Sequence, residues 1–364
     1  MRRALRRALP GAALTVLAFA CTLGPVVFAP SAVPTGLPTF GLGTDGVFVY
    51  VTALTALGML AMLATSVAVG YREQRRHDAG RRIRGFATDV GAGSAAVVVF
   101  GAVLAVVRPG SSGAVTPLSL VLALLSALVS IPLVVVAAAV AGAAFSRFQA
   151  ASEWRQCDGT SGRPFVVFVG AAFVAGGSTV VESWPMLFGP YSGEYGVPDR
   201  LPEYESVEGT LAAFASLEGL AGGLVLVGGG VVLGAYAARR HGFGESVRGV
   251  AGLVAMGSLV GVTVVPTAVA VAATGSAWAW VLGQPDGSLA LAVASLASVS
   301  VVTGVVTTLA AVAGLGVARF ENESGRDDPT AAAVTNGGTT AGDEATTPGG
   351  EGPSEPSTAD ETAR

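Results

Sequence analysis

The sequence predicts an all-α integral membrane protein with eight transmembrane helices, arranged as two parallel four-helix repeats. Three observations predict this fold class: half of the residues are apolar and only 13% are charged, long apolar runs recur along the chain, and a motif in the first half recurs in the second. A soluble protein carries about 25% charged residues. The low share of charge therefore indicates a chain that exposes its apolar surface to lipid.

Eight apolar segments are long enough to cross about 30 Å of hydrocarbon, which takes roughly 20 helical residues. They cover residues 11–29, 46–70, 86–107, 117–145, 165–183, 209–237, 250–273 and 288–318. Several contain Pro or Gly, which membrane helices tolerate because neighbouring groups satisfy the freed backbone atoms.

The arginines orient these spans. All 21 basic residues are arginine, and an N-terminus on the inner side puts 19 of them inside and only Arg108 and Arg200 outside. By the positive-inside rule, this predicts a multi-pass protein of the cell membrane with both termini in the cytoplasm. The first 20 residues also resemble a signal peptide. We expect them to be retained, because the Pro-x-x-Phe-x-Pro pattern after span 1 recurs after span 5.

The clearest internal similarity surrounds the only two histidines. Arg75-Arg76-His77-x-x-Gly80-x-x-Ile83-Arg84-Gly85 recurs as Arg239-Arg240-His241-x-x-Gly244-x-x-Val247-Arg248-Gly249, shifted by 164 residues. From residue 75 to residue 94 the shifted comparison gives 10 identities in 20 positions. The ends of spans 4 and 8 also match. Because each unit holds an even number of spans, both units enter the membrane the same way round, which predicts a pseudo-two-fold axis along the membrane normal.

These observations divide the chain into four parts. Residues 1–148 and 163–320 form the two four-span units, and residues 149–162 form a cytoplasmic linker. Residues 321–364 carry ten acidic and two basic residues among Thr, Gly and Pro, which predicts a disordered acidic tail. The absence of lysine, the Ala, Val and Gly content and the acidic tail together are typical of halophilic archaea.

Two glutamates stand out because ionisable groups inside spans mark candidate functional sites. Glu218 lies ten residues into span 6, about 15 Å at helical rise, which indicates a position near the midplane. Glu182 lies near the outer end of span 5. The pair predicts an ion or proton site in one outward-facing polar cavity. The alternative is that Glu218 is a neutral, hydrogen-bonded packing residue.

The two arginine-rich loops have two interpretations as well. Arg at the inner end of a helix interacts favourably with the helix dipole and reaches lipid phosphates. The functional alternative is a pair of loops that bind anionic lipid or a soluble partner. The candidate residues of these loops are Arg75, Arg76, His77, Arg84, Arg239, Arg240, His241 and Arg248.

Several function classes lack the residues that they need. Without lysine there is no P-loop or Schiff-base chemistry, and the sequence contains no Gly-x-Ser-x-Gly, His-Glu-x-x-His or Cys-x-x-Cys motif. We therefore expect no catalytic residue, metal site, cofactor or nucleic-acid partner. Two hypotheses remain: a permease whose path lies between the repeats, or a non-catalytic membrane subunit or scaffold, either of which would form homo-oligomers or bind a soluble cytoplasmic subunit.

Overall fold

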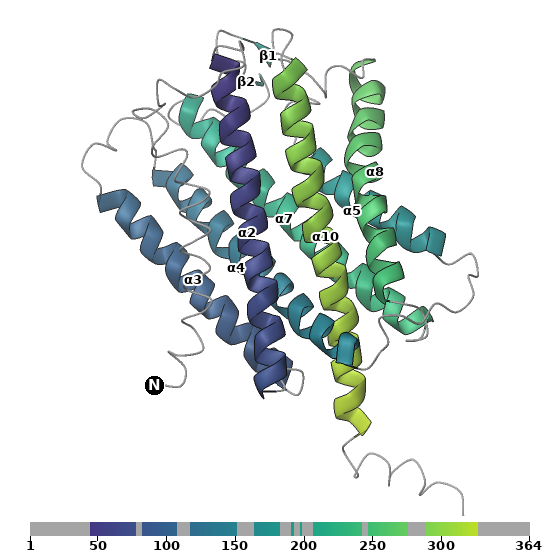
Figure 1. Cartoon of the computed structure of the whole chain (residues 1–364). Helices are drawn as coiled ribbons and strands as arrows, with labels where there is room; N and C mark the ends of the chain where they lie inside the picture. Colours follow the sequence, from purple (N-terminus) through teal and green to yellow (C-terminus); the bar gives the residue numbers. More distant parts are fainter. Residues whose placement is uncertain are drawn as a thin grey trace, which may run out of the picture. The chain divides into compact units, whose positions relative to one another are not determined.

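The computed structural model describes residues 44–77, 82–107, 117–150, 164–182, 191–192, 197–198, 207–241, 247–275 and 289–326. These ranges hold helices α2 (Thr44–His77), α3 (Ile83–Val107), α4 (Pro117–Ala150), α5 (Pro164–Glu182), α7 (Val207–His241), α8 (Val247–Thr274) and α10 (Leu289–Arg326) (Figure 1). A short antiparallel pair, β1 (Tyr191–Ser192) with β2 (Val197–Pro198), lies between α5 and α7. Its register pairs Tyr191 with Pro198 and Ser192 with Val197.

Within the described ranges, seven helices are long and apolar enough to cross a membrane. They coincide with the second to eighth predicted spans, and this confirms an α-helical chain of the multi-pass membrane type. The predicted first span, residues 11–29, lies outside the described residues, as do most of the linker and the tail beyond Arg326.

The helix ends differ from the predicted spans in one consistent way. α2, α4, α7 and α10 continue past the predicted C-terminal boundaries, and α10 runs through Arg326. Arg, Glu and Gln are good helix formers. The helical backbone can therefore continue after the apolar residues end, which hydropathy alone does not detect.

Local signals account for several other helix ends. α4 and α5 begin at Pro117 and Pro164, since proline fixes the first-turn φ and needs no backbone hydrogen bond there. α8 is followed by Gly275 at φ 73°, whose N–H donates to the carbonyl of Val271 at 2.9 Å. A residue in this left-handed conformation satisfies a terminal carbonyl and stops the helix.

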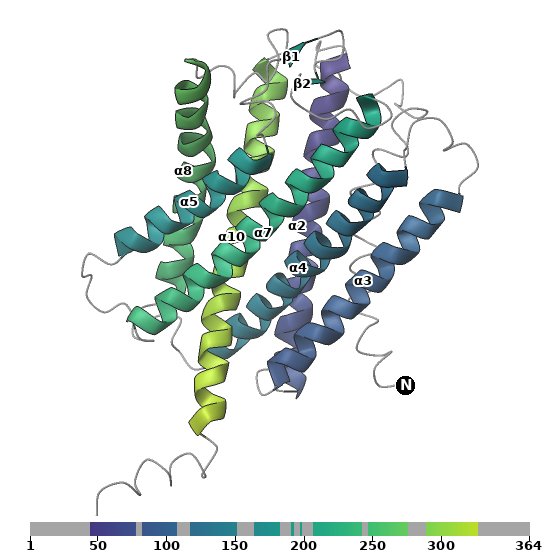
Figure 2. The same cartoon turned by 180° about the vertical axis from the view of Figure 1, so that it is seen from behind.

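The helices lie in two layers. One contains α3, α4, α7 and α5 in that order, and the other contains α2, α10 and α8 (Figures 1 and 2). The middle helices of the two layers share a buried apolar cluster to which each contributes a small or branched side chain. Its members include Leu63 of α2, Ala138 of α4, Val227 of α7 and Ala310 of α10. Neighbouring helices are therefore held together through the centre of the bundle.

Glycines bring helix backbones into direct contact within this centre. A methyl group at Gly70 of α2 would overlap the carbonyl of Ala139 in α4, and one at Gly142 of α4 would overlap the carbonyl of Val67. Small residues of this kind allow membrane helices to approach closely enough for extensive van der Waals contact.

The α7–α10 pair has the same pattern of contacts. A methyl group at Gly234 would overlap the carbonyl of Ala311, and one at Gly314 would overlap the carbonyl of Val231. Gly234 follows Gly70 by the 164 residues that separate the two arginine motifs. The α5–α8 pair is equally close, because Gly257 and Gly261 of α8 lie against the carbonyls of Phe168 and Ala172.

We expect Gly234→Ala to destabilise the protein by about 1–3 kcal/mol, because overpacking at a direct backbone contact forces the helices apart. Gly228→Ala in the same helix is the matched control, since nothing lies within 4 Å of a methyl group there. We expect Gly228→Ala to stabilise the helix by about 0.5–1 kcal/mol, because alanine has a higher helix propensity than glycine. Thermal unfolding in detergent measures both variants, and equal effects would contradict the α7–α10 register.

Candidate functional site

The two acidic residues singled out in the sequence are neighbours in the structure. Glu182 is the last residue of α5, and its side chain lies over Gly222 of α7. A methyl group at Gly222 would come within 2.6 Å of both Cγ and Oε1 of Glu182. The absence of a side chain at Gly222 lets the carboxyl group of Glu182 lie directly against the α7 backbone. Glu218 lies one helical turn from Gly222, so the two helices bring both carboxyl groups to the same region.

Because Glu182 lies over Gly222, one helical turn from Glu218, a charge on one carboxyl group would repel a charge on the other. Glu218 is half-buried and Glu182 is exposed. Like charges this close are unfavourable unless a proton, a cation or water compensates them. The arrangement is therefore suited to holding a positive charge between α5 and α7.

Two buried hydroxyl groups without a hydrogen-bond partner lie on the helices around this pair. Ser178 of α5 is 1% exposed and precedes Glu182 by one turn. Ser130 of α4 lies beside α7, with its Oγ 3.3 Å from the position that a methyl group at Gly223 would occupy. Burying a hydroxyl group without a hydrogen-bond partner lowers the stability of the folded protein. These two serines are therefore unusual for buried positions.

Several other buried hydroxyls in the described helices donate to their own backbone. Ser94 donates to the carbonyl of Val90 at 2.9 Å, and Ser258 donates to Val254 at 2.7 Å. This is the usual way in which serine is accommodated inside a helix. Ser130 and Ser178 depart from that pattern near the two glutamates.

The position of Glu218 along α7 places it level with the end of α5. It lies eleven residues after Val207 in a helix of 35 residues, about 17 Å from the helix end nearer the β1–β2 pair. Glu182, at the very end of α5, contacts α7 one turn further along the helix than Glu218. Glu218 therefore lies in the third of α7 nearer the β1–β2 pair, at the level where the end of α5 packs beside Gly222.

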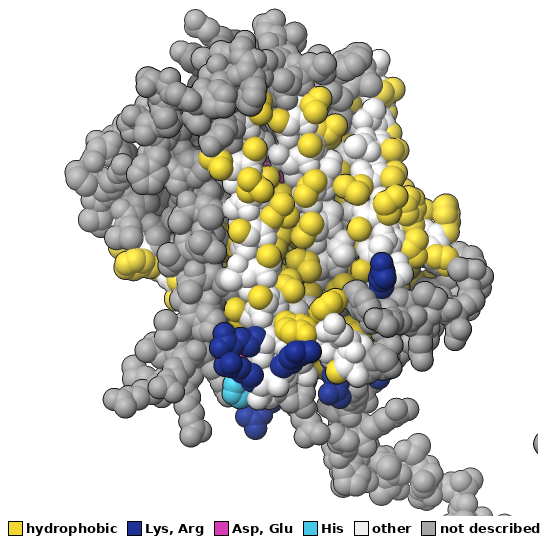
Figure 3. Space-filling view, viewed as in Figure 1, with side chains coloured by type: hydrophobic (Ala, Val, Ile, Leu, Met, Phe, Trp, Pro, Cys, Tyr) yellow, Lys and Arg dark blue, Asp and Glu magenta, His cyan; other side chains and the backbone are white. Residues whose placement is uncertain are grey.

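The arginines gather at the opposite end of the helices, where α2, α4, α7 and α10 finish and α3 and α8 begin (Figure 3). The described side chains there are Arg72, Arg75, Arg76, Arg82, Arg84, Arg147, Arg239, Arg248 and Arg319. Arg240 and His241 belong to the last turn of α7, and their side chains lie outside the described residues, as do Gly80 and Gly244.

Within the first arginine motif, side chains interact along α2. The guanidinium carbon of Arg75 lies 4.8 Å from the centre of the Tyr71 ring, a cation–π contact. His77 Nδ1 lies 3.2 Å from Glu73 Oε1. Tyr71 also donates to Gln149 Oε1 of α4 at 3.0 Å. These contacts fix the end of α2, while Arg75, Arg76 and His77 remain exposed.

Sequence reasoning identified Glu182 and Glu218 but missed Gly222, Ser130 and Ser178. The spacing of Ser178 and Glu182, four residues apart on one helix, was an available signal. The packing of α4 against α7 could not be predicted in this way, since no sequence pattern in either helix specifies which helix lies beside it. Within the described residues, no group of three or more His, Cys, Asp or Glu side chains could hold a metal ion.

No protein-family model matches the chain, and no curated protein or solved structure is significantly similar to it.

We expect Glu182→Gln and Glu218→Gln to have non-additive effects on stability, because each removes a carboxylate that acts on the other. Contacting charged groups usually show coupling energies of about 0.5–3 kcal/mol. A double-mutant cycle followed by thermal unfolding in detergent measures this coupling. The control cycle pairs Glu182→Gln with Glu73→Gln, which lies near the end of α2 that carries the arginines, and should be additive. Additive effects in both cycles would contradict an interaction between the two carboxyl groups.

Proposed function

We propose that this chain is a permease-like protein of the cell membrane that conducts a proton or small cation past Glu182 and Glu218. The observation that carries the proposal is the packing of Glu182 against Gly222 of α7, one turn from Glu218, with the unpaired hydroxyls of Ser178 and Ser130 on the neighbouring helices. Acidic groups are expensive within a membrane and are retained chiefly along ion and proton pathways.

The proposed architecture is two parallel four-helix repeats, with a path between them and both termini in the cytoplasm. Matched glycines support it, since Gly70 and Gly234 make the same kind of backbone contact, as do Gly142 and Gly314. A further contact also supports it. Gly316 of α10 lies against Ala144 of α4, and these two positions are equivalent when the ends of spans 4 and 8 are matched. Equivalent residues meet in this way beside a two-fold axis.

The path would begin at the end of the helices that carries the acidic pair. Glu182 and Glu218 come from the second proposed repeat, while Ser126 and Ser130 come from α4 of the first and face Gly219 and Gly223 of α7. The α4–α7 interface therefore joins the proposed repeats and is lined by hydroxyls at the level of the acidic pair. A cation attracted by the two carboxylates would meet oxygen atoms from both sides.

We expect Glu218→Gln and Glu182→Gln each to lower proton or Na⁺ flux into proteoliposomes at least about tenfold, since a neutral amide no longer attracts or carries the cation. A pH-sensitive dye and ²²Na⁺ uptake, each driven by an imposed membrane potential, measure the flux. Glu73→Gln is the control, because Glu73 lies near the arginine-bearing end of α2. Unchanged flux in both Glu182 and Glu218 variants would overturn the proposal, as would wild-type flux no higher than that of empty liposomes.

The second candidate function is that of a membrane subunit that docks a soluble partner. It is favoured by the exposed Arg75, Arg76 and His77, and by Arg239 at the corresponding position of the other motif. Arg side chains gathered at one end present a surface suited to an acidic protein.

We expect a docking subunit to co-purify with one stoichiometric soluble protein from native membranes in mild detergent. Replacing Arg75, Arg76, Arg239 and Arg240 with Gln should abolish the association by removing the charges that attract the partner, while Glu218→Gln should leave it unchanged. Mass spectrometry of the purified material identifies the partner. Purification without any partner would count against this second candidate and leave the flux proposal in place.

A further inference from the structure

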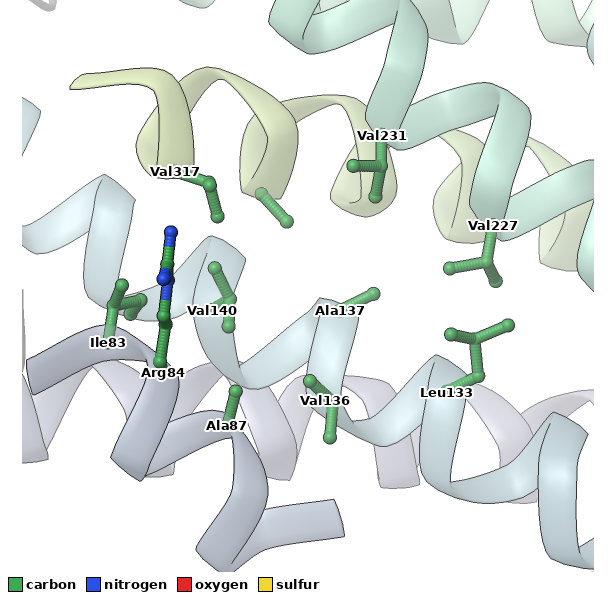
Figure 4. Close-up of a pocket in the computed structure, with 11 residues that line it drawn as sticks. Ile83, Arg84, Ala87, Leu133, Val136, Ala137, Val140, Val227, Val231 and Val317 are labelled. Atoms are coloured by element: carbon green, nitrogen blue, oxygen red, sulfur yellow. The ribbon is translucent and has the colours of Figure 1, made fainter. Parts of the chain in front are cut away.

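A cavity of about 190 Å³ lies among α3, α4, α7 and α10, near the arginine-bearing end of the helices (Figure 4). Its walls are aliphatic side chains from all four helices, including Val136 and Val140 of α4, Val227 of α7 and Val317 of α10. Among the residues that the structure describes, Arg84, in the first turn of α3, is the only charged one that lines it.

The size and lining of the cavity decide what can occupy it. Sites for drug-sized molecules usually measure about 300–1,000 Å³, so this cavity is too small for most polar solutes. Aliphatic cavities of about 150 Å³ stay dry and take up apolar guests. A slender hydrocarbon chain is the guest that matches such a cavity inside a membrane, and an ion or a water file is not.

Arg84 gives one end of the cavity a positive charge. Its side chain extends from α3 along the edge of the cavity toward Val317 of α10 (Figure 4). The guanidinium group is permanently charged and presents several donors that match a phosphate. It lies at the end of the helices where the other described arginines gather, and where lipid headgroups would meet a membrane protein of this orientation. Basic pockets between membrane helices at that level commonly bind anionic headgroups.

Two residues that border the cavity are smaller than the residues matched to them in the other half. Matching the ends of spans 4 and 8 pairs Ala137 with Leu309 and Val317 with Phe145. Arg84 pairs with Arg248 through the 164-residue shift of the arginine motifs. The smaller residues Ala137 and Val317 border the space beside Arg84. The two halves differ where a ligand would need room.

We propose that this cavity binds one hydrocarbon chain of an anionic membrane lipid, with the lipid phosphate at Arg84. The proposal is independent of the flux through Glu182 and Glu218, because none of the residues lining the cavity belongs to the acidic site. It assigns different roles to Arg84 and Arg248, although the two occupy matched positions.

The test is native mass spectrometry of the full chain, delipidated in detergent and titrated with phosphatidylglycerol or phosphatidylcholine. We expect one site that prefers phosphatidylglycerol. Arg84→Gln should weaken binding of phosphatidylglycerol about fivefold, since one basic residue near a membrane surface contributes roughly that factor. It should weaken phosphatidylcholine binding less, because the choline group of that lipid offsets the charge of its phosphate. Arg248→Gln, the matched control, should change neither.

Two variants test the cavity itself. Ala137→Leu and Val317→Phe introduce the residues found at the equivalent positions of the other half, and each should lower the occupancy of both lipids at least fivefold. Val317 is only partly buried, so Val317→Phe keeps the test available where Ala137→Leu disturbs folding. Glu218→Gln should leave lipid binding unchanged. Equal losses for Arg84→Gln and Arg248→Gln, or wild-type binding by Val317→Phe, would overturn the proposal.

Discussion

Direct contact between helix backbones is the constraint on which the other features of this structure depend. Inside a membrane, apolar side chains gain nothing by leaving lipid for protein, so helices associate through close packing. Gly70 and Gly142 provide that packing between α2 and α4, and Gly234 and Gly314 provide it between α7 and α10. These contacts fix the register of the central helices, and the register decides which side chains meet elsewhere.

The acidic site follows from the same kind of contact. Gly222 leaves a space on α7 that the side chain of Glu182 enters from the end of α5. A larger residue at position 222 would require the side chain of Glu182 to shift from this place. A glycine that allows close packing elsewhere thus admits a charged group here, and the unpaired hydroxyl of Ser178 precedes that group by one turn of α5.

The differences between the two halves are as informative as their similarity. Glu218 corresponds to Leu54 under the 164-residue shift, and Ala137 corresponds to Leu309 where the ends of spans 4 and 8 are matched. In each case one half carries a residue suited to ordinary packing, while the other carries a charge or leaves a cavity. In the proposed architecture, the acidic site would be built around the second repeat. The lipid cavity would be flanked by α3 and α4 of the first.

The sequence by itself determined the helical membrane class, seven of the spans to within a few residues at most ends, and the identity of the two acidic residues. It did so because hydropathy and charge are properties of single residues and short windows. Tertiary structure alone decided that Glu182 meets Gly222 one turn from Glu218, and that Ala137 and Val317 border a cavity beside Arg84. These features depend on the register between helices distant in the chain, and in an Ala-, Val- and Gly-rich sequence many registers share the same hydropathy pattern. Only the fit of particular glycines against particular carbonyls distinguishes among them.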